Sequence, residues 1–281
     1  MKCLWFDIVG LARSNSVRFF IQFIAWNPAL MSPEILKQLA PTGTLRAAIN
    51  LSNFLLVTGK SPSGDPEGVA PDLARAIAGR LGVNLKLVPF KTPGELADAA
   101  ESDVWDIGLI GAEPARAEKI AFSHAYVEIE ATYLVPAGSK LRTIADVDRP
   151  GIRIAVAARS AYDLWLVRNI RQAELVHAAG IDAAFDLFVN DKLEALASLR
   201  PRLLADVEKL PGARILDGQF TAVQQAVGTP RRNAAGAAFL RDFVEEAKAS
   251  GLIAGLIARH RVAGLSVAPA ALAANQDGLP S

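Results

Sequence analysis

The apolar residues of this chain recur at every fourth position in some segments and at every second position in others. Apolar residues recur at every fourth position from Val69 to Leu81, which predicts an amphipathic helix over Pro71–Leu81 that ends at Gly82. Two leucines fall on one face of the next block, which predicts a strand over Asn84–Phe90. A helix followed closely by a strand indicates an α/β arrangement.

Blocks of these two kinds continue along the chain. The other strands are predicted at Leu45–Asn50, in a segment ending at Gly111, and at Glu130–Pro136, Ile152–Ala157, Glu174–His177, Arg214–Phe220 and Ala222–Val227. The other helices are predicted at Gly94–Ser102, Ser160–Arg171, Ile181–Phe188, Pro201–Lys209, Ala234–Ala249 and Leu252–His260. Alternating strands and helices favour an α/β fold with mostly parallel sheets.

A break at Ala137–Lys140 separates two such sets. A second extended crossing at 217–229 would return the last helices to the first set, which predicts two lobes, two hinge strands and a cleft. We expect residues 43–134 and 225–261 in lobe 1 and 135–224 in lobe 2. Residues 1–42 are expected to lie outside the fold as an N-terminal extension, and 262–281 to form a disordered tail.

The stretch from Val104 to Tyr126 suggests the chemistry of the cleft. A buried strand ends at Gly111, and a helical turn that opens at Pro114 carries Arg116. Unpaired backbone N–H groups at such a strand end and helix start attract anions. An arginine fork nearby would complete a site for a carboxylate.

The composition of the chain argues against several kinds of partner and site. Thirty Lys and Arg residues against 29 Asp and Glu give a formal charge of +1 without a basic run, so we expect no nucleic-acid partner. The single cysteine and three scattered histidines predict no intrachain disulfide, metal or other cofactor. No apolar run is long enough to predict stable membrane insertion.

The N-terminus carries a weak targeting signal. An apolar patch at Phe19–Trp26 follows two arginines, but polar residues interrupt it and no small-x-small cleavage site follows. Ser32 and Pro33 have the pattern of a natural helix start. Our hypothesis is that residues 1–30 are a translated upstream extension or a weak export signal.

Several short motifs occur in a familiar order. Together they resemble the type II periplasmic solute-binding proteins of ABC importers, in the amino-acid group known as solute-binding protein family 3, over about residues 43–261. The segments that carry the resemblance are Gly43–Arg46, Gly68–Ala74 (like Gly-Phe-x-x-Asp-Leu-Ala), Leu81–Val83, Trp105–Ile107, and Glu113–Arg116 followed by Ile120–Tyr126 (like Thr-x-x-Arg…Phe-Ser-x-x-Tyr). Asp72 and Asp106 in these motifs also fit purely structural roles, because such residues cap helices and turns.

The resemblance implies a periplasmic-binding-protein-like II fold and a binding protein rather than an enzyme. It implies that Arg116 grips the ligand's α-carboxylate with backbone N–H groups near Gly111 and Ser160, and that Phe54 and Phe90 sandwich the ligand. Further ligand candidates, by position, are Asn53, Tyr162 and Gln224. It also implies a small carboxylate ligand, a partner ABC permease, a monomer and a periplasmic location.

The chain departs from the family at two places. Amino-acid binders pair the ligand ammonium with a carboxylate in an Asp-Ala-x-x-x-Asp segment, but Leu199 stands where the second Asp belongs and Arg200 follows it. Gly111 stands where the family commonly has a hydroxyl. Because a buried ammonium without an anionic partner is costly, the ligand could be a carboxylate lacking an amine. Arg116 and Arg200 could then hold two acidic groups, and the alternative for Arg200 is a plain surface role.

Two other interpretations stay open. Cyclohexadienyl and arogenate dehydratases resemble these binding proteins and need a general acid, for which Glu194, Glu128 or Glu130 could serve. Glu128 and Glu130 fall on one face of a presumed strand, which is more typical of a solvated edge. The weak export signal also leaves room for a cytoplasmic sensor of small acids.

Overall fold

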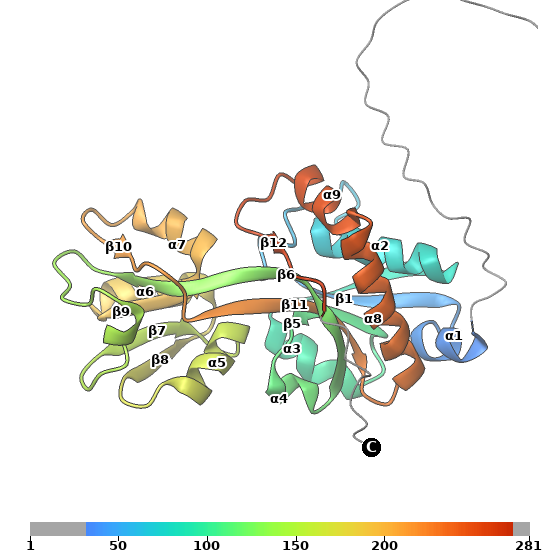
Figure 1. Ribbon diagram of the computed structural model, residues 1–281, viewed down its shortest axis with the longest axis horizontal. Coiled ribbons are helices and arrows are strands. Elements are labelled where there is room, and N and C mark those ends of the chain that lie inside the picture. Colours follow the sequence, from blue (N-terminus) through green and yellow to red (C-terminus); the bar gives the residue numbers. More distant parts are fainter. Residues whose placement is uncertain (1–31, 272–281) are drawn as a thin grey trace, which may run out of the picture.

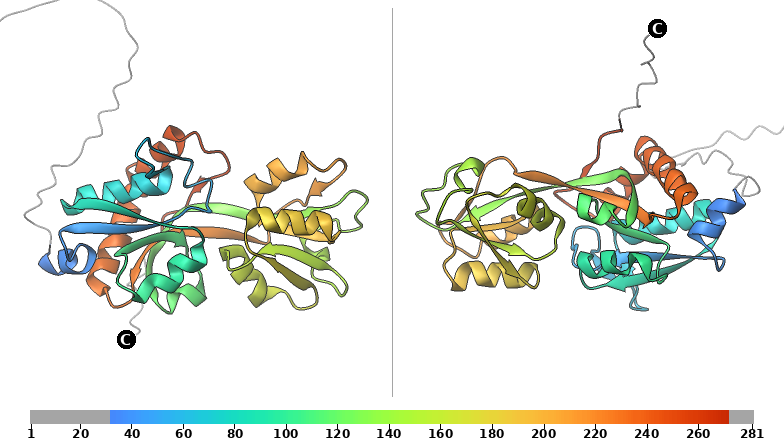
Figure 2. Two further views of the ribbon diagram at one scale, coloured as in Figure 1. Left: turned by 180° about the vertical axis from the view of Figure 1, so that it is seen from behind. Right: turned by 90° about the horizontal axis from the view of Figure 1, so that it is seen from below.

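Two long antiparallel strands, β6 (Ile120–Val135) and β11 (Thr221–Pro230), run through both lobes of the protein (Figure 1). The computed structural model describes residues 32–271. Because β6 and β11 pair along most of their length, the two half-sheets form one ten-stranded mixed sheet in the order β4-β1-β5-β11-β6-β9-β7-β8, with β10 and β12 also on β6. Helices cover both faces of the sheet in each lobe (Figure 2).

The first lobe is built on three parallel strands, β1, β4 and β5. Its strands are β1 (Thr44–Asn50), β4 (Asn84–Phe90), β5 (Ile107–Gly111) and the small pair β2 (Gly59–Lys60) and β3 (Pro66–Glu67). Its helices are α1 (Pro33–Leu39), α2 (Val69–Leu81), α3 (Pro93–Asp98), α4 (Pro114–Ala117), α8 (Ala234–Ala249) and α9 (Leu252–Arg259), with a 3₁₀ turn at Ala99–Glu101. The main core of the lobe lies between α2, α8, α9 and the sheet.

The second lobe repeats the scheme with a parallel set in the order β9-β7-β8. Its strands are β7 (Arg153–Ala157), β8 (Glu174–Ala178), β9 (Ala195–Leu199) and β10 (Arg214–Ile215). Its helices are α5 (Ala161–Asn169), α6 (Ile181–Asn190) and α7 (Arg200–Val207), with a 3₁₀ turn at Ile144–Asp146. A separate hydrophobic core fills this lobe, so each lobe has packing of its own.

Local sequence patterns predicted most of the helices and strands close to their observed positions. The predicted helix over Pro71–Leu81 is α2, which begins two residues earlier and ends at Gly82 in the left-handed conformation. The prediction missed strand β9, whose five residues are all buried. A strand that is buried on both faces shows no polar–apolar alternation, so its periodicity gives no signal. Where the prediction had two strands over 214–227, the structure has the short β10 and the longer β11.

Both ends of the described chain belong to the fold, unlike the prediction. Within the expected extension 1–42, α1 packs on the first lobe and buries Leu39 completely, while residues 1–31 lie outside the described part. Within the expected tail 262–281, β12 (Ser266–Val267) pairs with β6, and Ala268 donates its backbone N–H to Tyr126. Val262 and Leu265 pack against the cores of both lobes. We call residues 262–268 the C-terminal strap.

The two acidic residues of the sequence motifs have structural partners. Asp106 is buried and accepts hydrogen bonds from the backbone and the guanidinium of Arg46, at 2.7 to 3.0 Å. Asp72 lies 2.8 Å from the Nε2 atom of His260. Both carboxylates therefore tie separate segments of the first lobe together, and neither faces the cleft.

None of the helices within residues 32–271 combines the length and apolar character that crossing a lipid bilayer requires.

Candidate functional site

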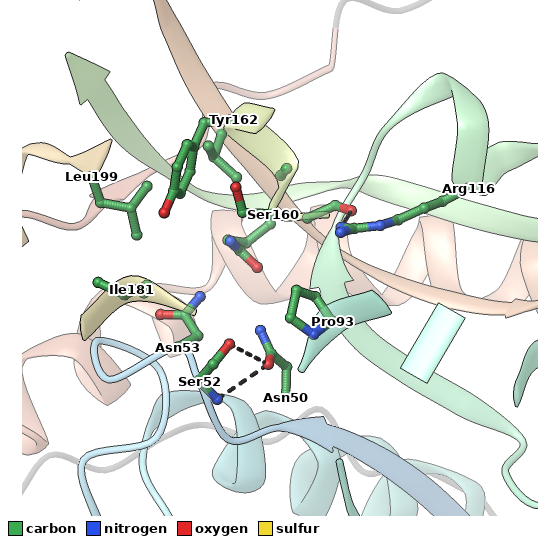
Figure 3. Close-up of a pocket in the computed structure, with 13 residues that line it drawn as sticks. Asn50, Ser52, Asn53, Pro93, Arg116, Ser160, Tyr162, Ile181 and Leu199 are labelled. Carbon is green, nitrogen blue, oxygen red and sulfur yellow. Dashed lines mark hydrogen bonds between the residues drawn. The ribbon is translucent and has the colours of Figure 1, made fainter. Parts of the chain in front are cut away.

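A cavity lies between the two lobes, beside the crossing strands. It is formed where β1 and β5 end in the first lobe and where α5 and α7 begin in the second. Ligands of open α/β sheets bind at such strand ends. The lining residues are Asn50, Ser52, Asn53, Pro93, Gly111, Arg116, Ser160, Ala161, Tyr162, Ile181, Leu199, Val223 and Gln225, most of which are labelled in Figure 3.

Arg116 provides the positive charge of the cavity. Its side chain reaches from α4 toward Ser160 in the other lobe (Figure 3) and is only 6% exposed. It donates one hydrogen bond to the carbonyl oxygen of Gly111 (2.7 Å) and one to that of Arg159 (2.9 Å). No carboxylate among the described residues forms an ion pair with it. A buried guanidinium held by neutral carbonyl groups retains N–H donors for an anion.

The surroundings of Arg116 disfavour its charge. Burial lowers the pKa of its guanidinium from the usual 12.5 to about 10. The negative charge of Glu113 raises this pKa and the positive charge of Arg159 lowers it further. An anion bound in the cavity would relieve the cost of burying this charge.

The second lobe presents a helix start to Arg116. Ser160 caps α5 and accepts a hydrogen bond from the backbone N–H of Asp163, whose side chain accepts one from the backbone N–H of Arg159. Arg159 adopts a left-handed conformation with φ of 59°, which is uncommon outside glycine. This tight turn holds the carbonyl of Arg159 against Arg116 and leaves the positive end of α5 at the cavity.

Gly111 lies at a close contact between the two lobes. A Cβ atom at this position would stand 2.8 Å from the Cβ of Ala161 and 3.1 Å from a methyl carbon of Val223. Ala161 belongs to the second lobe, so a side chain at position 111 would separate the lobes. The absence of the family's hydroxyl at this position therefore matches the close contact between β5 and α5.

Amide side chains form the polar wall of the cavity. The Oδ1 atom of Asn50 accepts hydrogen bonds from the backbone N–H and the hydroxyl of Ser52, and the Oδ1 of Asn53 accepts one from the backbone N–H of Leu55. The Oε1 atom of Gln225 is buried and has no hydrogen-bond partner among the described residues. This wall therefore offers neutral hydrogen-bonding groups and no charge.

The wall opposite Arg116 is apolar. Leu199, at the start of α7, is 5% exposed and lies beside Tyr162 (Figure 3). Burial raises the pKa of the Tyr162 hydroxyl, so this group is neutral at physiological pH. In the described chain, nearby carboxylates are engaged outside the cavity in the pairs Asp98–Arg159 (2.6 Å), Glu113–Arg168 (2.5 Å) and Asp163–His177 (2.9 Å). Arg116 is thus the only charged residue that lines the cavity among residues 32–271.

The structure brings together five of the eight residues predicted for ligand binding: Asn53, Gly111, Arg116, Ser160 and Tyr162. The two predicted aromatic residues lie elsewhere. Phe54 is 38% exposed outside the lining, and Phe90 packs in a small core beside Leu96. Their positions do not support an aromatic sandwich around the ligand.

Arg200 also lies outside this cavity. Its Nε atom donates to the carboxylate of Glu130 at 2.5 Å, and the pair lines a second cavity together with Glu128. Two acidic groups held by Arg116 and Arg200 therefore do not fit this arrangement.

Sequence reasoning selected Gln224 where the structure places Gln225. Side chains of a strand alternate between faces, so an error of one residue exchanges the cavity face for the opposite one. It also missed Asn50 and Ser52, which begin the loop after β1. Their position at the end of a predicted parallel strand was the available signal.

Comparison with known proteins identifies a family that this chain matches. A family model described as bacterial extracellular solute-binding proteins, family 3, matches residues 54–262. Cyclohexadienyl dehydratase of Pseudomonas aeruginosa is 26% identical over 211 residues, which cover 68% of this chain and 78% of that protein.

Solved structures show the same fold. A mutant of ArgBP from T. maritima superposes with a TM-score of 0.65 at 22% identity and covers 81% of this chain and 99% of its own. The amino acid ABC transporter substrate-binding protein AbpA from Streptococcus pneumoniae, bound to L-arginine, gives 0.64 at 19% identity, with 79% and 96% covered. At such identities the likeness establishes the two-lobed fold and leaves the ligand open.

Proposed function

This chain belongs to the bacterial extracellular solute-binding proteins of family 3, and we propose that it binds a small organic acid between its lobes and closes on it. The observation that carries the proposal is Arg116. A buried guanidinium that lines an interlobe cavity, with no acidic partner among residues 32–271, is suited to a carboxylate supplied from solution.

The lobes are expected to close on the ligand because each lobe supplies part of its contacts. Arg116 belongs to the first lobe, whereas Ser160 and the first turn of α5 belong to the second. A carboxylate between them would contact both lobes only when the lobes meet, so binding shifts the population toward the closed form. The strands β6 and β11 connect the lobes and would act as the hinge.

Family membership supports a role in uptake. In this proposal the closed protein delivers its ligand to an ABC permease, outside the cytoplasmic membrane. The similar protein from S. pneumoniae is an amino acid ABC transporter substrate-binding protein, which agrees with this role. Recovery of the protein in the extracellular or periplasmic fraction of its host would support the location, and recovery only in the cytoplasm would contradict it.

A ligand screen tests the proposal. Protein starting at Met31 is heated with amino acids, hydroxy acids, keto acids, dicarboxylates and prephenate, and titrated by calorimetry with each compound that raises the melting temperature. A ligand at a hundred times its Kd adds about 2.7 kcal/mol of stability, which is easily measured. We expect an organic acid to bind, Arg116→Ala to abolish binding, and Arg200→Ala, an arginine outside the cavity, to retain it. Unchanged affinity in Arg116→Ala would overturn the proposal.

The match to cyclohexadienyl dehydratase favours an enzyme as the second candidate. Such a reaction needs a general acid near the leaving group, yet the cavity lining contains no carboxyl side chain within the described chain. Glu194 is paired with Arg153, and Glu128 and Glu130 line the other cavity. Consumption of prephenate by the wild type but not by Arg116→Ala would establish the enzyme, whereas binding without turnover would exclude it.

A further inference from the structure

The groups that line the cavity restrict its ligand further than the requirement for one carboxylate does. Among the described lining residues, Arg116 is the one charged group, and the remaining polar groups are amides and hydroxyls. We propose that the ligand is an amine-free monocarboxylate that carries a hydroxyl group. This inference rests on the proposed function of the cavity and specifies its substrate class.

The charge count limits the ligand to one carboxylate. Arg116 can neutralise a single carboxylate, and its guanidinium is buried at the cavity. The other candidate cations are paired, Arg159 with Asp98 and Arg200 with Glu130 in a different cavity. A second carboxylate would be buried without a partner, at a cost of several kcal/mol.

The same count excludes an amine. Near the cavity, Asp98 and Glu113 pair with Arg159 and Arg168, and the carboxylate of Asp163 accepts a hydrogen bond from the backbone N–H of Arg159 and lies 2.9 Å from the Nε2 atom of His177. The position that would face an ammonium from the second lobe is Leu199, an apolar residue. An α-amino acid would therefore bury its ammonium against neutral groups only.

The amide wall selects a hydroxyl over a carbonyl. Because the Oδ1 atoms of Asn50 and Asn53 accept hydrogen bonds from neighbouring groups, the NH₂ groups of these side chains are the atoms left to face the cavity (Figure 3). Gln225 requires a donor instead, because its buried Oε1 atom accepts no hydrogen bond from any residue that the structure describes. A hydroxyl both accepts and donates a hydrogen bond, whereas a keto oxygen only accepts and an ammonium only donates.

Matched triplets of acids test the proposal. Each triplet shares one carbon skeleton and differs at C2, for example L-lactate, pyruvate and L-alanine, or L-phenyllactate, phenylpyruvate and L-phenylalanine. Malate, oxaloacetate and aspartate, together with 3-hydroxybutyrate, test the number of carboxylates and the position of the hydroxyl. Calorimetry on the full chain and on protein starting at Met31 gives each Kd.

A substitution at Leu199 supplies the reverse test. Leu199→Asp would place an anion opposite Arg116, and Leu199→Asn is its uncharged control of the same shape. Both variants are expected to fold, because position 199 is the N-cap of α7, where Asp and Asn are favoured. We expect Leu199→Asp to improve the ratio of amino-acid to hydroxy-acid affinity at least about tenfold over Leu199→Asn, as one added charge partner would.

The outcomes separate this inference from the proposed function. Tightest binding by a hydroxy monocarboxylate, with the switch in Leu199→Asp, supports it. Tighter binding by a keto or amino acid than by the hydroxy acid of the same skeleton, or by malate than by every hydroxy monocarboxylate, overturns it while the organic-acid function stands. Absence of binding by every acid, or an affinity that Arg116→Ala leaves unchanged, overturns both.

Discussion

The guanidinium of Arg116 in the first lobe donates a hydrogen bond to the carbonyl oxygen of Arg159 in the second, at 2.9 Å. The side chain that would hold the ligand carboxylate therefore also contributes to the contact between the lobes. Binding and closure share one residue, so a change at Arg116 should alter both.

The pH dependence of binding should follow Arg116. Its pKa of about 10 means that the positive charge is present at neutral pH and is lost from the ligand-free protein above pH 10. Since burial lowers this pKa, the cost to folding is present below about pH 10 and is relieved above it. We expect constant affinity between about pH 6 and 9 and a decrease of about tenfold per pH unit above 10. Calorimetry checks this, with circular dichroism to confirm folding; constant affinity to pH 11 would contradict it.

Gly111 should be required for closure. Gly111→Ala would place a methyl group 2.8 Å from the Cβ of Ala161, which is too short for two carbons, so the lobes must separate. We expect affinity to fall at least about tenfold, the equivalent of 1.4 kcal/mol. The double variant Gly111→Ala with Ala161→Gly removes the opposing carbon and should recover most of the loss. Equal affinities of Gly111→Ala and the wild type would show that these atoms do not meet in the bound state.

Two ion pairs that connect the lobes should differ in how much they contribute to ligand affinity. Glu113, whose side chain is 9% exposed, pairs with Arg168, whereas Asp98, at 64%, pairs with Arg159. We expect Glu113→Gln to weaken binding about tenfold, because it leaves Arg168 without its partner at a partly buried site. Asp98→Asn should cost about threefold or less, as exposed pairs do. Calorimetry in low and high salt compares them, and a larger effect of Asp98→Asn would refute this ranking.

The Asp98 pair should also be sensitive to acid. The hydrogen bond from Arg159 lowers the pKa of the Asp98 carboxyl, so the pair is formed at neutral pH. Its contribution to closure is lost as the pH falls through this lowered pKa. The affinity of the wild type should therefore approach that of Asp98→Asn in acid, where both are measured in parallel. A difference between the two proteins that grows on acidification would contradict this assignment.

The C-terminal strap should depend on Gly264. Its φ of 80° favours glycine, and an added Cβ would stand 2.3 Å from the Pro201 ring of the second lobe. Gly251 has a similar φ of 78° and open space around it, so Gly251→Ala measures the conformational cost alone. We expect about 1 kcal/mol of destabilisation for Gly251→Ala and at least about twice that for Gly264→Ala. Urea unfolding gives both values, and equal values would show that the strap yields without cost.

Local patterns in the sequence were enough for most of the framework. The four-residue apolar spacing of α2 and the pattern of β4 depend on neighbours a few residues away, so they appear in any sequence window. Strand β9 was not predicted because all of its residues are buried, which removes the alternation of polar and apolar residues. The C-terminal strap was missed for another reason: its position depends on segments distant in the sequence, through the pairing of β12 with β6 and the packing of Val262 and Leu265 on both cores.

Local sequence patterns were sufficient to predict the α/β framework and to single out Arg116, since an arginine after a strand end and a helix start is a local signal. Tertiary structure decided what surrounds that arginine. The register of β11, which shifts at Gln225, brings Gln225 rather than Gln224 to the cavity. The meeting of the lobes places Leu199 there and leaves Arg200 with Glu130. Burial, charge pairing and side-chain direction all depend on segments distant in the chain, so no local pattern could determine them.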